Sequence, residues 1–162
     1  MPQTGTIFIS IAEQSLVYRQ AGRVLFECAV STAKNGAGEL NGSECTPRGW
    51  HYIRAKIGAD QPVNTVFIGR RPSGEIYTAG MRQAHPQRDW ILTRILWLCG
   101  LEPGFNRLGN VDTMRRYVYI HGCPDEDDFA RPDSHGCIKL HNPDMLALFD
   151  YTNAGTPVLI TE

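Results

Sequence analysis

The sequence lacks an excess of charge of either sign. Its 162 residues carry 16 lysines and arginines against 17 aspartates and glutamates, which gives a formal net charge of -1 at pH 7. These charges are scattered along the chain, whereas binding to nucleic acid requires basic side chains gathered on one face. We therefore expect no nucleic-acid partner.

Long apolar runs are also missing. No segment approaches the roughly 20 apolar residues that a membrane-spanning helix requires. Residues 1–6 contain neither the basic segment nor the start of an apolar run of about 7–15 residues that is typical of a secretory signal. We expect no membrane partner and a cytoplasmic location, or a periplasmic one if a signal peptide precedes these residues. The sequence predicts nothing about oligomeric state.

Cysteine is scarce, and its five positions form no disulfide framework. Secreted scaffolds pair an even set of cysteines at compact spacings, whereas an odd and scattered set indicates reduced thiols. Cys28 and Cys99 lie in apolar segments and are interpreted as small buried hydrophobic residues, and Cys45 as a loop thiol. The two remaining cysteines, Cys123 and Cys137, lie in polar, glycine-containing surroundings.

Apolar residues alternate with polar ones in three short runs, at residues 6–12, 16–18 and 24–30. A period of two is typical of antiparallel strands. Further strands are expected at 50–57, 117–121 and 156–161, and a loop at 34–49, which is rich in Gly, Asn, Ser and Pro. No linker or repeat divides the chain, so residues 1–162 are predicted to form a single, mainly β domain.

Two segments carry helical signals. The first begins with Asp89 as a cap, ends at Gly100, and would place Ile91, Leu92, Ile95, Leu98 and Cys99 on one face. The second begins with Asn142 as N-cap and Pro143 in the first helical position, and would bury Met145, Leu148 and Phe149. The expected fold is therefore mainly β, with an inserted amphipathic helix and a short helix after Cys137.

The stretch Ser134–Cys137 reads Ser-His-Gly-Cys and places a thiol beside a candidate base. A cysteine is nucleophilic only as the thiolate, so it needs a nearby histidine or cationic environment to lose its proton near neutral pH. His135 is one candidate, and His121, at the end of an expected strand, is the other. Gly122 and Gly136 lack a Cβ, and the amides around Gly136 and Cys137 could face a developing oxyanion.

Two other functions compete with acyl transfer, because His-Gly-Cys occurs at both 121–123 and 135–137. Two histidines and two cysteines could form a tetrahedral zinc site. The spacing differs from the usual cysteine knuckle, and a closed metal site would consume the thiolate, so the acyl-transfer hypothesis is favoured and no metal or cofactor is expected. A redox pair between Cys123 and Cys137 stays open and requires Cα atoms within about 7 Å.

His121-Gly122, followed by Ser134-His135-Gly136-Cys137-Ile138, resembles the signature of the YkuD-type L,D-transpeptidase catalytic domain. The similarity extends over nearly the whole chain, because residues 30–32, 46–49 and 153–158 also resemble family landmarks. The resemblance implies a β-sandwich or barrel-like fold of mixed strands. It also implies that Cys137 is the nucleophile, His121 the general base and the Gly122 carbonyl the group that orients the imidazole.

The same resemblance assigns roles to the remaining site residues. Ser134, His135 and Gly136 would shape the pocket and the oxyanion site. Lys139 stands where family members commonly carry arginine, and it is expected to bind substrate as a cation without the bidentate fork of arginine. Cys123, which directly follows the His-Gly pair, is a departure from the pattern.

The implied substrate is a peptidoglycan tetrapeptide stem or muropeptide. Cys137 would attack the carbonyl between meso-diaminopimelate and the terminal D-Ala, release D-Ala and form a thioester. Water as acceptor gives an L,D-carboxypeptidase, whereas an amine acceptor gives an L,D-transpeptidase that makes 3-3 cross-links. The expected cytoplasmic location favours water and a role in peptidoglycan recycling.

Overall fold

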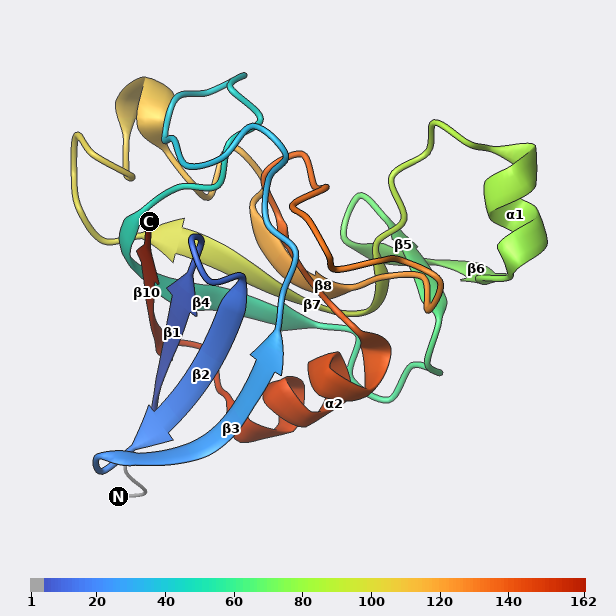
Figure 1. Ribbon diagram of the computed structural model, residues 1–162, viewed down its shortest axis with the longest axis horizontal. Coiled ribbons are helices and arrows are strands. Elements are labelled where there is room, and N and C mark those ends of the chain that lie inside the picture. Colours follow the sequence, from blue (N-terminus) through green and yellow to red (C-terminus); the bar gives the residue numbers. More distant parts are fainter. Residues whose placement is uncertain (1–4) are drawn as a thin grey trace.

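The computed structural model describes residues 5–162, and one mixed ten-stranded sheet dominates it (Figure 1). The main path of the sheet runs β3-β2-β1-β10-β4-β7-β5-β6, and β8 joins β7 to β9. The pairs β1–β10 and β8–β9 are parallel and the others antiparallel. The mainly β class with mixed strands is therefore confirmed. The strands are β1 (Thr6–Ser10), β2 (Ser15–Gln20), β3 (Arg23–Ala29), β4 (Gly49–Ile57), β5 (Thr65–Ile68), β6 (Arg71–Ile76), β7 (Leu92–Gly100), β8 (Tyr119–Gly122), β9 (Ile138–Leu140) and β10 (Pro157–Thr161).

Strands β1, β2 and β10 confirm the alternation seen in the sequence. Ile7 pairs with Tyr18 of β2 on one side and with Val158 of β10 on the other, and all three side chains are buried. Residues at alternate positions of a strand share a face, so each of these strands directs one apolar row into the core. The loop expected at 34–49 is confirmed up to Gly49, where β4 begins.

Helix α2 (Asn142–Tyr151) covers the core beside β7 and β8 (Figure 1). It buries Met145, Leu148 and Phe149, as predicted. The expected cap is wrong by one residue, because His141 holds the N-cap position and Asn142 begins the helix. The Asn142 side chain bonds across the fold instead: its Oδ1 accepts from Thr93 Oγ1 at 2.6 Å.

The helix predicted from Asp89 to Gly100 is wrong, because this segment forms the central strand β7. β7 pairs with β4 along one edge and with β8 along the other, and seven of its nine residues are buried. A strand buried on both faces needs no polar alternation. Its apolar residues can then fall at helical spacing by chance, and periodicity cannot separate the two structures.

The segment between β4 and β7 forms a small unit that the sequence did not predict. It comprises β5, β6 and α1 (Ala79–Ala84), and Figure 1 shows it on the opposite side of the molecule from β3. Every residue of β6 is exposed and α1 buries none of its own, so neither element carries an apolar pattern. A 3-10 turn, Gly109–Val111, was likewise not expected. Within residues 5–162, no helix has the length and hydropathy needed to cross a bilayer.

Candidate active site

Cys137 lies immediately before β9, where the parallel pairing of β8 and β9 brings two distant segments together. Ile120 pairs with Ile138 and His121 with Lys139. The Tyr119 N–H donates to Cys137 Sγ at 3.3 Å, and the thiol donates to the Tyr117 carbonyl at 3.6 Å. The strand expected from 117 begins only at Tyr119, because Tyr117 adopts a left-handed conformation with φ of 56°.

The pKa of the Cys137 thiol is raised to about 12, so the thiol is protonated at neutral pH. Burial is the main cause and Asp89 adds to it, while the Tyr119 N–H and the Arg116 cation oppose the shift. Arg116 is half-buried and donates to the Cys45 carbonyl at 2.6 Å. A neutral thiol needs a base that removes its proton as it attacks.

His121 on β8 has the properties of such a base. Its side chain is buried, and burial lowers its pKa; Asp89 and the Gly122 carbonyl oppose the shift, while Lys139 adds to it. The imidazole is therefore neutral at pH 7. Its Nδ1 lies 2.6 Å from the Gly122 carbonyl, which accepts only if Nδ1 carries the proton. That tautomer leaves Nε2 as the proton acceptor.

The Ser134–Gly136 loop is held by hydrogen bonds of its own side chain and backbone and by one from Thr46. Ser134 Oγ donates to the Cys137 carbonyl at 2.5 Å and accepts from the Gly136 N–H at 3.2 Å. Thr46 Oγ1 donates to the Gly136 carbonyl at 3.0 Å. Gly136 has a φ of 130°, which side-chain-bearing residues rarely adopt. Its amide is engaged by Ser134, whereas the Cys137 N–H has no acceptor within residues 5–162.

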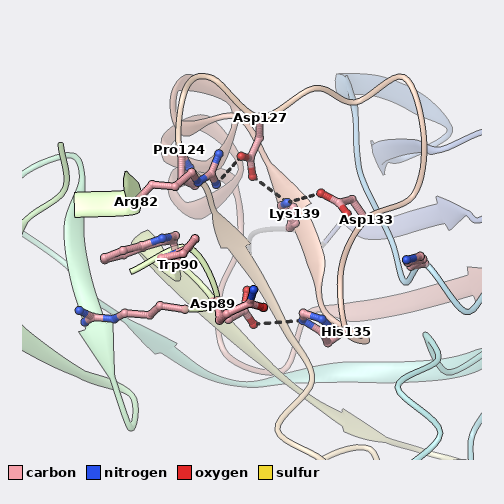
Figure 2. Close-up of a pocket in the computed structure, with 12 residues that line it drawn as sticks. Arg82, Asp89, Trp90, Pro124, Asp127, Asp133, His135 and Lys139 are labelled. Carbon is pink, nitrogen blue, oxygen red and sulfur yellow. Dashed lines mark ion pairs between the residues drawn. The ribbon is translucent and has the colours of Figure 1, made fainter. Parts of the chain in front are cut away.

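Lys139 does not lie free for substrate. Its side chain is only 10% exposed, and Nζ lies 2.7 Å from Asp127 Oδ2 and 4.0 Å from Asp133 Oδ2. His135 is the opposite case: it is exposed, and its Nδ1 lies 4.0 Å from Asp89 Oδ2 (Figure 2). The structure therefore groups Cys137 and His121 at the β8–β9 pair and sets His135 and Lys139 beside them.

Asp127 is a site residue that sequence reasoning missed. Its other oxygen, Oδ1, lies 2.6 Å from Nη2 of Arg82 on α1, and Oδ2 faces Lys139 on β9. The carboxylate therefore links α1 to β9 (Figure 2). Burial alone would raise the pKa of Asp127, but Lys139 and Arg82 hold it below its usual value. An acidic run at 125–128 is typical of a solvated surface, and the partner Arg82 lies 45 residues away, so the sequence carried no signal for this contact.

A pocket of about 350 Å³ opens next to His135 and Lys139 (Figure 2). Cys137 and His121 are not among its lining residues, so it lies beside the reacting pair. Four cationic side chains and three carboxylates line it, together with His135. These are Lys34, Arg82, Arg88 and Lys139, and Asp89, Asp127 and Asp133.

Cys123 lies apart from Cys137. It is fully buried, its Sγ donates to the Leu140 carbonyl at 3.3 Å, and burial raises its pKa to about 12. In the β8–β9 register Cys137 is level with Tyr119, four residues before Cys123. Four residues of strand span about 13 Å, well beyond the roughly 7 Å limit for a disulfide. This separation contradicts the redox pair and the zinc site that would use both thiols.

A thiol beside a buried, neutral, strand-borne imidazole is the arrangement of cysteine acyl-transfer sites. The comparisons define the family. The YkuD model, an L,D-transpeptidase catalytic domain, matches residues 4–160. The chain therefore belongs to the YkuD family of L,D-transpeptidase catalytic domains.

Individual relatives agree with this assignment. YqjB of Bacillus subtilis (strain 168), provisionally named an L,D-transpeptidase, is 39% identical over 59 residues, or 36% of this chain and 32% of that protein. L,D-transpeptidase 3 of Mycobacterium tuberculosis superposes with a TM-score of 0.59 at 16% identity over 99% of this chain and 62% of that one. A Cys-to-Ser form of an Enterococcus faecium L,D-transpeptidase gives 0.58 at 18% identity, over 98% and 50%. The structural matches show a shared fold, and this chain spans half to about three-fifths of their length.

Proposed function

We propose that this protein is a cysteine acyl-transfer enzyme that cleaves peptidoglycan tetrapeptide stems between meso-diaminopimelate and the terminal D-Ala. The observation that carries the proposal is the placement of the pair. Cys137 lies level with Tyr119 in the β8–β9 register, two residues from His121, and the Gly122 carbonyl fixes the tautomer of the His121 imidazole. Family membership supplies the substrate class.

The first half-reaction forms a thioester. His121 Nε2 takes the thiol proton as Cys137 Sγ attacks the carbonyl carbon, and the Tyr119 N–H stabilises the charge developing on sulfur. The oxyanion accepts a hydrogen bond from the Cys137 N–H. When the tetrahedral intermediate collapses, the C–N bond breaks, His121 returns the proton to the departing amine, and D-Ala leaves.

The second half-reaction transfers the acyl group to an acceptor, for which we favour water. Lys34 is an exposed cation in the lining of the pocket beside the site. Its charge attracts the carboxylates of a donor stem and repels a protonated amine acceptor. With water, His121 deprotonates the acceptor and the tripeptide leaves, so the protein acts as an L,D-carboxypeptidase. This activity suits the recycling of soluble muropeptides in the cytoplasm.

The test is incubation of a defined tetrapeptide with wild type, Cys137→Ala and Cys123→Ala, with and without an acceptor stem. We expect wild type and Cys123→Ala to release D-Ala and tripeptide, and Cys137→Ala to release neither. Release that persists in Cys137→Ala contradicts the nucleophile. A 3-3 cross-linked dimer as main product would instead establish the alternative, an L,D-transpeptidase.

A further inference from the structure

Three of the four cations that line the pocket are already neutralised by this chain. Lys139 faces Asp127 and Asp133. Arg82 pairs with Asp127 as well, with Nη2 2.6 Å from Oδ1. Arg88 lies 3.2 Å from a Glu75 carboxylate oxygen, and its guanidinium carbon is 4.4 Å from the centre of the Trp90 ring. None of the three offers an unshared charge to a ligand.

Lys34 is the exception. It is exposed and lines the same pocket, and it has no ion-pair partner within residues 5–162. Its backbone is held beside the Cys137 loop, because the Lys34 N–H donates to the Ser134 carbonyl at 2.9 Å and Ala33 forms a bridge with Ser134. An exposed cation on a fixed backbone beside the reacting loop is placed to meet a ligand.

One donor in the wall of the pocket also lacks a partner. The Trp90 side chain is buried there, and its indole N–H has no acceptor within residues 5–162. The ligand that would balance the unpaired Lys34 cation is an anion with acceptor oxygens. A carboxylate meets this requirement.

We propose that Lys34, and not Lys139, is the residue that binds a free carboxylate of the stem peptide. This inference rests on the proposed function and names the specificity determinant of its donor site. A tetrapeptide stem offers three such groups: the terminal carboxylate of D-Ala, the side-chain carboxylate of meso-diaminopimelate and the α-carboxylate of the γ-linked D-Glu. Lysine binds any of these groups as a compact point charge.

The experiment measures binding without turnover. Tetrapeptide is titrated calorimetrically into Cys137→Ala, alone and combined with Lys34→Met, Lys34→Arg or Arg23→Gln; Arg23 is an exposed cation on β3, outside the pocket. Loss of a charge-assisted contact predicts that Lys34→Met raises the Kd about tenfold. Lys34→Arg and Arg23→Gln are expected to change it less than about threefold. An equal effect of Lys34→Met and Arg23→Gln overturns the inference, as does an absence of tetrapeptide binding.

Three amidated ligands identify the carboxylate. The first carries D-Ala as its amide, the second carries amidated meso-diaminopimelate and the third carries amidated D-Glu. We expect one of them to bind equally to the proteins with and without the Lys34→Met substitution, because the group that Lys34 contacts has lost its charge. A tenfold effect that persists with all three amides overturns the inference. Lys34-dependent binding without D-Ala release in wild type contradicts only the proposed function, whereas normal release with Lys34-independent binding contradicts only the role of Lys34.

Discussion

Replacing Asp127 with asparagine removes a buried charge and nearly preserves the side chain's shape. The carboxylate is 5% exposed and lies within 2.7 Å of both the Lys139 and the Arg82 nitrogens. After Asp127→Asn, the Lys139 ammonium, itself 10% exposed, has only the distant Asp133 oxygen at 4.0 Å. The variant therefore leaves a largely buried cation without a close charged partner.

The loss of stability depends on how far the cations that lose the carboxylate can still reach water. Removing one partner of a fully buried ion pair costs about 3–5 kcal/mol. Arg82 is 36% exposed and can turn to water, which reduces the penalty. We expect a loss of about 2–3 kcal/mol in the free energy of unfolding at pH 7. For a chain of this size that corresponds to a fall of about 5–10 °C in Tm.

Urea unfolding of wild type, Asp127→Asn and Asp133→Asn measures this cost. Asp133 is 63% exposed, so its substitution should cost no more than about 0.5 kcal/mol. Because the pKa of Asp127 is lowered in the folded state, its contribution is present above the unfolded pKa and lost as pH falls through the folded value. The difference between wild type and Asp127→Asn should therefore narrow only below about pH 4. Equal costs for the two variants at pH 7 would refute the reasoning.

Two further predictions concern the thiol and its loop. Because the pKa of Cys137 is raised to about 12, the rate of its alkylation by iodoacetamide should rise about tenfold per pH unit from pH 7 to 9. Cys137→Ala serves as the blank. A plateau below about pH 8 would indicate a resting thiolate and contradict this prediction. Ser134→Ala removes the hydroxyl that joins the Gly136 amide to the Cys137 carbonyl. We expect kcat for D-Ala release to fall about tenfold while KM stays within about twofold. An unchanged kcat would show that these two hydrogen bonds do not position the nucleophile.

Strands that bury one face were predictable from sequence, whereas strands of other kinds were not. Ile7 and Ile9 alternate with less buried neighbours, and this pattern has one structural interpretation. Leu92, Ile95 and Leu98 lie in β7, which is buried on both faces. Their spacing therefore indicated that they are buried, but not whether they lie in a helix or in a strand. The exposed strand β6 carried no pattern because neither of its faces enters the core.

The same distinction applies to the site. Ser134–Cys137 and His121-Gly122 are contiguous segments, so their chemistry was visible as motifs. The partners of Lys139 come from another loop and, through Asp127, from Arg82, and tertiary packing alone brings them together. Sequence therefore predicted a substrate contact at Lys139, where the structure places an internal ion pair and leaves Lys34 as the free cation of the pocket within residues 5–162.

The most direct test of the central claim is the intact mass of the protein after brief reaction with a tetrapeptide stem and acid quench. We expect an adduct equal to the stem without D-Ala, located on Cys137 by peptide mapping and absent from Cys137→Ala. Release of D-Ala with no adduct, or an adduct on another residue, would contradict the assignment of Cys137 as the nucleophile.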